Sequence, residues 1–172
     1  MGVTAENVAN KFQVTRQEQD KFALKSQEKA LKAIKENKFK DEITNFKIKS
    51  KKAEIDFNKD EHPRDGINLE GLTRLKPVFQ KDGTVTAGNA SGINDGAAAV
   101  TLMSEEEAKK RDLKKLVTIK SWASCGVEPA LMGTGPIPAT KKALDLAGWK
   151  IDDVDLFEVN EAFAAQSIAV LK

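Results

Sequence analysis

One short stretch near the C-terminal end, residues 156–166, constrains the fold and the function more than any other. Its first part, up to Val159, is apolar and has the length of a buried strand, and its last part has the composition of a helix. Asn160 and Glu161 lie at the junction, where α/β folds place ligands and catalytic groups. The Asn160 amide could hold a water molecule or a carbonyl oxygen there. The alternative, which spacing alone favours, is that Asn160 only caps the helix.

The region before this stretch predicts one strand–helix–strand unit. Residues 116–123 are predicted to be a strand, residues 126–139 a loop, and residues 139–147 a helix that ends at Gly148 in the left-handed conformation. Residues 154–159 are then the second strand. Two strands joined through a helix imply a parallel sheet, so we expect an α/β fold.

The N-terminal half predicts helices and a β-ribbon. Thr15 with Glu18 forms a capping-box pattern that begins a helix running to about residue 36. The Lys and Glu residues of this helix are interpreted as its solvated face. The other predicted elements are a helix at 4–12, strands at 43–48 and 53–57, a helical turn at 69–75, a strand or helix at 97–103, and a charged helix from Ser104 to Arg111.

Composition limits the classes of function. The chain has 172 residues, 40% of them apolar, which is enough for one core or for pieces of two. A net charge of +2, with lysines spread along the chain, implies no strong attraction to nucleic acid or to membrane surfaces. No apolar run reaches the length of a membrane span, and the first residues do not have the pattern of a signal peptide.

The single cysteine and the single histidine limit the chemistry further. Cys125 cannot form an internal disulfide, so it suits a reducing compartment, and it is interpreted as a small core residue. His62 lies between Glu61 and Pro63 and is interpreted as a solvated loop residue rather than a catalytic base. One Cys and one His argue against a zinc site of the usual kind, so no metal is expected.

Both ends of the chain are abrupt. Residues 164–172 have the pattern of an apolar helix with nothing after it. Phe163, Ile168 and Leu171 therefore need a partner surface against which they can be buried. We expect the chain to be an internal part of a larger protein.

Three motifs together resemble the thiolase family. They are Asn-Glu-Ala-Phe-Ala at 160–164, the small, glycine-spaced stretch 86–97, and Met-Gly-Thr-Gly-Pro-Ile-Pro at 132–138. Taken alone, residues 84–92 indicate either a tight loop or a place where backbone approaches a ligand closely. The order and length of the three motifs make the resemblance specific. It covers essentially the whole chain, including the opening residues 1–8.

The resemblance implies a fragment of the thiolase fold, in which two similar α/β halves carry a loop domain inserted in the first half. Residues 1–92 would be the CoA-binding loop domain, and residues 93–115 the segment that returns to the N-terminal half. Residues 116–172 would be the first part of the C-terminal α/β half. Because the family assembles as dimers or tetramers, a homo-oligomer is expected, with no nucleic-acid or membrane partner.

The chemistry that the resemblance implies is a reversible acyl transfer. A cysteine thiolate takes an acetyl group from one acetyl-CoA, and a second cysteine removes a proton from the methyl group of another. The resulting carbanion attacks the acetyl-enzyme, giving acetoacetyl-CoA and free CoA. A histidine activates the nucleophile, and oxyanion holes hold the thioester oxygens. Coenzyme A is here a substrate rather than a cofactor.

The family's site residues can be carried over one by one onto matching positions. Asn160 would position a water molecule in an oxyanion hole. The remaining residues would surround CoA or its acyl group: Ser91 near the pantetheine, Ala87, Phe79 and Leu75 around CoA, Arg64 near the nucleotide end, and Met132, Phe163 and Met1 in the acyl pocket.

The chain departs from the family pattern in its reactive residues. The catalytic cysteines and histidines would lie before Met1 and beyond Lys172, and neither Cys125 nor His62 matches a catalytic position. The chain alone is therefore expected to be inactive. The alternatives to a part of an enzyme are a short non-catalytic module that binds CoA or a partner thiolase, and a lipid carrier of thiolase ancestry. The expected location is the cytoplasm, with the mitochondrion left open because the true N-terminus would lie upstream.

Overall fold

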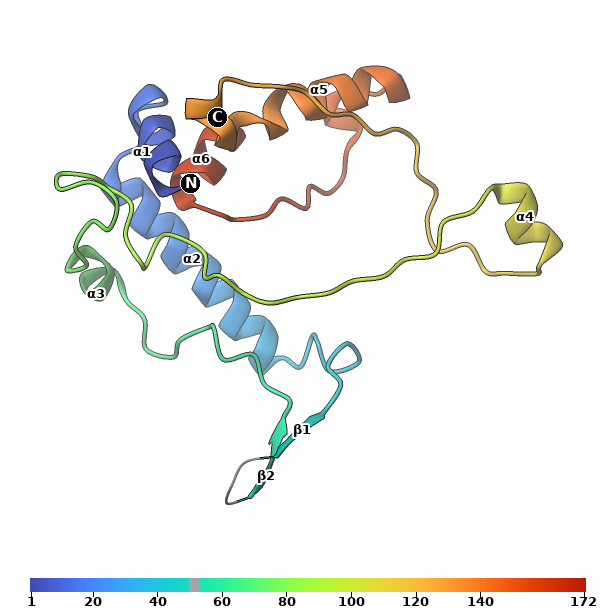
Figure 1. The fold of residues 1–172 in the computed structure, drawn as a ribbon, viewed down its shortest axis with the longest axis horizontal. Coiled ribbons are helices and arrows are strands. Elements are labelled where there is room, and N and C mark those ends of the chain that lie inside the picture. Colours follow the sequence, from blue (N-terminus) through green and yellow to red (C-terminus); the bar gives the residue numbers. More distant parts are fainter. Residues whose placement is uncertain (50–52) are drawn as a thin grey trace. The chain divides into compact units, whose positions relative to one another are not determined.

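The computed structural model describes residues 1–49 and 53–172, which fall into two compact units (Figure 1). The first unit combines Met1–Gly92 with Asn160–Lys172, and the second is Ile93–Val159. The C-terminal segment thus belongs with the N-terminal half of the chain. Each unit is described by itself below.

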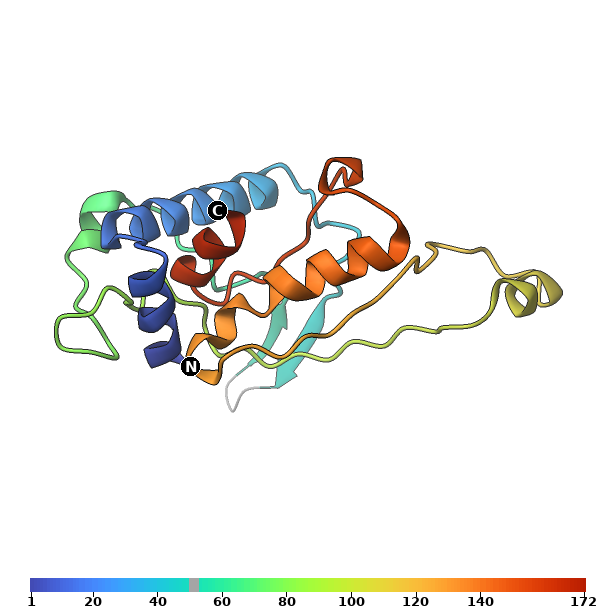
Figure 2. The same ribbon diagram turned by 90° about the horizontal axis from the view of Figure 1, so that it is seen from above.

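Helices form the body of the first unit. They are α1 (Gly2–Lys11), α2 (Arg16–Lys35), α3 (Leu69–Thr73) and α6 (Ala164–Leu171). Figure 2 shows the red α6 beside the blue helices α1 and α2, and it contacts both of them. Ala9, Val14 and Ala165 form a buried cluster between these helices, with Phe12 and Ile168 packed against it.

This packing changes one expectation about the C-terminal helix. Ile168 was expected to need a surface outside the chain, but α6 already buries its apolar side against α1 and α2. Ala165 and Ala169 are almost completely buried, and their small side chains let the helices approach closely. Leu171, in contrast, is 74% exposed.

The predicted capping box of α2 is confirmed. The Thr15 hydroxyl accepts a hydrogen bond from the Glu18 backbone N–H, and the Thr15 backbone N–H donates to the Glu18 carboxylate at 2.6 Å. This backbone hydrogen bond from Thr15, followed by the one from the Thr15 hydroxyl, lowers the pKa of Glu18. The local pattern alone therefore fixes where the longest helix begins.

The predicted β-ribbon is confirmed, with shorter strands. Strand β1 (Phe46–Lys49) pairs antiparallel with β2 (Glu54–Phe57). Phe46 lies opposite Phe57, and Ile48 lies opposite Ile55, so the apolar residues share one face of the ribbon. All eight strand residues are exposed.

The second unit contains two α-helices and two short 3-10 helices. They are α4 (Glu105–Lys110), η1 (Pro129–Thr134), α5 (Pro136–Ala147) and η2 (Ile151–Asp153). Ser104 caps α4 as predicted by accepting a hydrogen bond from the Glu107 backbone N–H. Gly148 ends α5 with φ 69° and ψ 26°, the predicted left-handed cap.

Two predictions for this unit are wrong. Residues 126–139 are not a loop, because η1 and the start of α5 lie within them. Pro136 begins α5, and a proline fits the first helical position because the N–H that it lacks has no partner there. Residues 97–103, predicted to be a strand or a helix, are neither.

The predicted parallel sheet is also not formed by the described residues. Residues 116–123 and 154–159 have no ladder of hydrogen bonds, although Ser121 donates one hydrogen bond to the Ala143 carbonyl of α5. A strand exists only when a neighbouring strand accepts and donates its backbone hydrogen bonds. Leu116 and Leu156 accordingly remain 87% and 79% exposed.

Across the described ranges, no helix is both long and apolar enough to cross a membrane.

Candidate functional site

The junction at Asn160 differs from the sequence prediction. Helix α6 begins at Ala164, and its N-cap residue is Phe163 rather than Asn160. The capping alternative is therefore wrong. Asn160 is exposed, and among the described residues no hydrogen bond is found for its side chain. Its amide groups are thus accessible to a water molecule or to a ligand.

Two of the three sequence motifs lie against each other in the first unit. Ala90 and Phe163 form an antiparallel bridge, and the Ser91 backbone N–H donates to the Ala162 carbonyl at 3.0 Å. The Ala164 N–H donates to the Asn89 carbonyl at 2.9 Å, which satisfies one of the N–H groups at the start of α6. We call residues 84–91 the site loop. The family resemblance assigned residues of both motifs to the acyl-CoA site, but it did not predict that their backbones are paired.

A carboxylate of α1 anchors the beginning of the site loop. Glu6 is only 4% exposed, and its carboxylate accepts hydrogen bonds from the backbone N–H groups of Thr84 and Val85 and from the Thr84 hydroxyl. These bonds measure 2.8–2.9 Å. Hydrogen bonds to a charged group are the stronger kind, so this end of the loop is firmly held.

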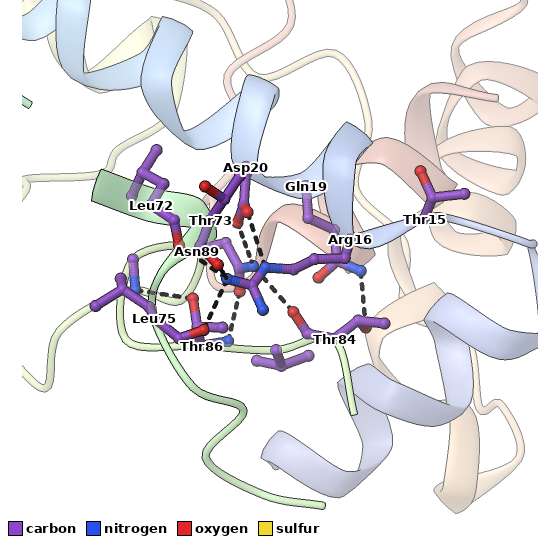
Figure 3. Close-up of polar contacts among 12 residues, drawn as sticks. Thr15, Arg16, Gln19, Asp20, Leu72, Thr73, Leu75, Thr84, Thr86 and Asn89 are labelled. Atoms are coloured by element: carbon purple, nitrogen blue, oxygen red, sulfur yellow. Dashed lines mark hydrogen bonds and ion pairs between the residues drawn. The ribbon is translucent and has the colours of Figure 1, made fainter. Parts of the chain in front are cut away.

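A second buried carboxylate, on α2, anchors the rest of the loop (Figure 3). Asp20 accepts one hydrogen bond from Arg16 Nε at 2.8 Å and one from Asn89 Nδ2 at 3.0 Å. Asn89 also donates to the Thr84 carbonyl at 3.1 Å and accepts from the Thr86 N–H at 2.8 Å. All of these polar groups lie within one network. The sequence offered no signal for it, because Asp20 and Asn89 are 69 residues apart.

Four of the predicted CoA-binding residues lie on or near this loop. Ala87 and Ser91 are exposed, and Leu75 and Phe79 are 38% and 43% exposed. The Phe79 ring packs edge-to-face on Phe163, with ring centroids 6.4 Å apart and planes at 76°. These side chains are thus available to a ligand while their backbone is fixed.

The other predicted binding residues are more scattered. Arg64 is exposed, and its backbone N–H donates to the Gln27 side chain of α2 at 3.0 Å. Met1, at the start of α1, is 80% exposed. Met132 belongs to the second unit, where it is 48% exposed in η1. The structure therefore gathers the site-loop residues with Phe163 but does not place Met132 relative to them.

A cavity of about 260 Å³ lies between α2, the site loop and the start of the C-terminal segment. Its lining includes Ser26, His62, Ser91 and Glu161, and the Ser26 hydroxyl donates to the Glu161 carboxylate at 2.5 Å. No role was expected for Ser26, Glu161 was expected only to lie at the junction with Asn160, and His62 was expected in a solvated loop. His62 is exposed, yet it also lines this cavity. The one signal in the sequence for this cavity is that Glu161 is adjacent to Asn160.

Comparison with known families decides the classification. The family description "Thiolase, N-terminal domain" matches residues 1–106, and "Thiolase, C-terminal domain" matches residues 113–172. The chain belongs to the thiolase family. As a thiolase, it has the α/β class of fold that was expected from its sequence, although the described residues form only the two-stranded ribbon as a sheet.

Relatives named acetyl-CoA acetyltransferase are similar to this thiolase chain along its whole length. It is 56% identical to the acetyl-CoA acetyltransferase of Rhizobium meliloti and 58% identical to that of Shinella zoogloeoides, in each case over 172 residues. It is 55% identical over 174 residues to the cytosolic acetyl-CoA acetyltransferase of Mus musculus. These alignments cover all of the chain but only 44% of each relative.

Solved thiolase structures give the same result. The acetyl-CoA acetyltransferase of Bacillus anthracis matches with a TM-score of 0.92 and 52% identity. A human mitochondrial 3-ketoacyl-CoA thiolase matches with a TM-score of 0.92 and 48% identity. Each match covers 99% of this chain and 43% of the solved one. The chain thus spans less than half the length of the thiolases that it matches.

Proposed function

We propose that this chain is part of an acetyl-CoA C-acetyltransferase, the enzyme that joins two acetyl-CoA molecules to give acetoacetyl-CoA and CoA and that catalyses the reverse thiolysis. The observation that carries the proposal is the pairing of the site loop with residues 162–164 through backbone hydrogen bonds. This pairing brings the exposed Ser91 and the Asn160 motif into one unit. The names of the relatives support the choice of acetyl-CoA as substrate.

In this proposal Asn160 supplies part of an oxyanion hole. Its exposed amide can fix a water molecule or the thioester oxygen, on which negative charge develops in the transition state. A donor held in place before the reaction stabilises this charge without further reorganisation. Because Asn160 does not cap α6, its donors remain available for this task.

The remaining predicted residues would contact different parts of the bound thioester. Ser91 and Ala87 would contact the pantetheine, together with Leu75 and Phe79, while Arg64 would lie near the nucleotide. Phe163, Met132 and Met1 would line the acyl pocket. The exposed side chains and fixed backbone of the site loop support this division, since a held loop loses little entropy when it binds a ligand.

The nucleophile and the base are proposed to come from outside these 172 residues. Cys125 is only partly accessible, in the second unit, and we assign it a packing role. His62 donates its backbone N–H to the Asp60 carboxylate in a surface loop, and we assign it no catalytic role. The chain alone is accordingly proposed to be inactive, and the active enzyme to be a cytoplasmic homo-oligomer.

The test compares the natural protein that contains this chain with the 172-residue chain alone. We expect the natural protein to form acetoacetyl-CoA from acetyl-CoA, and the chain alone to form none. Asn160→Ala in the natural protein should lower kcat roughly 100-fold, as the loss of one oxyanion-hole donor does. Gel filtration with light scattering checks that the variant keeps the same oligomer.

Two outcomes would contradict the proposal. An unchanged rate for Asn160→Ala would remove the role given to this residue. A natural protein that binds CoA but never forms acetoacetyl-CoA would replace the enzyme with a non-catalytic CoA-binding module.

A further inference from the structure

We propose that Asp20 is a positioning residue of the acyl-CoA site, which holds the parts of the protein that contact the pantetheine end of the ligand. Its carboxylate acts in two directions, through Arg16 on the turn at Leu75 and through Asn89 on the site loop. The inference rests on the proposed function, because it assumes that the site loop contacts an acyl-CoA.

The first argument is the chemistry of Asp20 itself. It is 0% exposed, and each carboxylate oxygen has one donor, Arg16 Nε on one side and Asn89 Nδ2 on the other. A charged group is kept in such a place only when it is paired and hydrogen-bonded. A carboxylate is purely an acceptor, so each of its two oxygens can serve one donor, whereas asparagine has an NH2 donor in place of one of these oxygens.

The first direction runs through Arg16 to the turn after α3. Arg16 Nη2 donates to the Leu72 carbonyl at 2.8 Å and to the Leu75 carbonyl at 2.9 Å. Carbonyl groups at the end of a helix lack partners within the helix, and a cation is favourable there. The ion pair with Asp20 orients the guanidinium, so Asp20 fixes the backbone that carries the Leu75 side chain.

The second direction runs through Asn89 to the site loop. The Asn89 side chain is 3% exposed and uses both amide donors and its oxygen, on Asp20, on Thr84 and on Thr86. Ala87 lies inside the loop segment that these bonds close, and the Asn89 carbonyl also holds the first N–H of α6. Asp20 thus supports, through Arg16, the turn that carries Leu75 and, through Asn89, the loop that carries Ala87, two residues predicted to lie around CoA. Figure 3 shows Asp20 between Arg16 and Asn89.

The nucleotide end of the site is held differently. Arg64 is fixed through its backbone N–H to Gln27, and the described contacts include no bond from Arg64 to Asp20, Arg16 or Asn89. Loss of the Asp20 charge should therefore loosen one end of the ligand site and leave the other unchanged. Binding would then have to order the freed loop, and this entropy cost weakens affinity for the pantetheine portion.

The experiment uses the natural protein that contains this chain and two substrates, acetyl-CoA and S-acetylpantetheine, which lacks the nucleotide. Asp20→Asn removes the charge and turns one acceptor into a donor. We expect KM to rise about 10-fold for both substrates, the loss typical of a hydrogen bond to a charged group, with kcat changed less than KM. Arg64→Ala should raise KM for acetyl-CoA only. Titration of the unsubstituted protein and of each variant with CoA allows the same comparison to be made from dissociation constants.

The matched control is Glu70→Gln. Glu70 also pairs with an arginine, Arg74, but both side chains are exposed on or next to α3 and outside the network. Exposed pairs contribute little, so neither KM nor kcat should change.

Arg16→Lys is the second test variant if Asp20→Asn does not fold. It keeps a charge beside Asp20 but loses the forked contact with the Leu72 and Leu75 carbonyls, and it should raise both KM values in the same way.

Each result separates the possibilities. An unchanged KM with a lower apparent kcat would mean that Asp20 only supports folding, and would overturn the proposal. A rise in KM for acetyl-CoA alone would place the effect at the nucleotide end and would also overturn it. If the unsubstituted protein binds no CoA and consumes neither substrate, the proposed function itself fails. Normal turnover with normal KM in Asp20→Asn refutes only the positioning role.

Discussion

At the scale of single residues, the site loop depends on side chains that do not face the ligand. Asn89 joins Asp20, Thr84 and Thr86, and Glu6 holds the loop from α1. Because Glu6, Asp20, Thr86 and Asn89 are buried, the loss of any one of them leaves a polar partner unsatisfied, at a cost of roughly 1–3 kcal/mol. Ala87 and Ser91 are exposed, and the buried network fixes the backbone of the loop that carries them.

Gly88 is the residue at which close packing of the loop can be tested. A Cβ atom at this position would lie 2.5 Å from Leu72 Cδ2 and 2.6 Å from Leu75 Cδ1. We expect Gly88→Ala to lower the free energy of unfolding by about 1–3 kcal/mol, because a methyl group has to displace packed side chains. Chemical denaturation measures the change. Gly126→Ala, where no atom lies within 4 Å, is the control and should be near neutral; equal effects of the two variants would contradict the packing argument.

At the scale of elements, features set by local signals could be predicted from the sequence, whereas long-range strand pairing could not. The start of α2 at Thr15 and the end of α5 at Gly148 were predictable, because a cap depends on residues within a few positions of each other. The ribbon was predictable from alternation. The strand assignment for 154–159 was wrong, because pairing requires a neighbour that a local pattern cannot supply.

The candidate site shows the same limit. The three motifs identified the family, but the hydrogen bond between Asp20 and Asn89 could not be inferred from either residue alone. Spacing favoured a helix cap at Asn160, yet α6 begins four positions later, after the bridge between Ala90 and Phe163. Tertiary pairing thus decided the geometry of the site.

The capping box of α2 predicts a pH dependence of stability. Its hydrogen bonds lower the pKa of Glu18 in the folded protein, so the stabilisation is complete above the ordinary pKa of 4.5 and is lost as the pH falls through the lowered value. Glu18→Gln should therefore melt at a lower temperature than the unsubstituted protein at about pH 7, and the difference should narrow towards about pH 4.

Thermal unfolding over this pH range checks the expectation for Glu18. The control is Glu28→Gln, at an exposed position in the middle of the same helix. A difference between Glu18→Gln and the unsubstituted protein that stays constant over the range, or that grows as the pH falls, would contradict the role given to the Glu18 charge.

At the scale of the whole molecule, less than half of a thiolase is enough to assemble one side of the proposed site. The first unit brings α1, α2, the site loop and α6 together around one buried polar network. The second unit carries Met132 and Cys125 and contributes extended segments with exposed leucines. The central claim concerns the first unit: an acyl-CoA binds along the site loop, with its pantetheine at Ala87 and Ser91.

A crystal structure of the natural protein with bound CoA tests this claim most directly. We expect the pantetheine to contact Ser91, Ala87 and Leu75, the nucleotide to lie beside Arg64, and the thiol to point towards Phe163 and Asn160. Coenzyme A bound without contact to Ser91, Ala87, Leu75 and Arg64 would contradict the account.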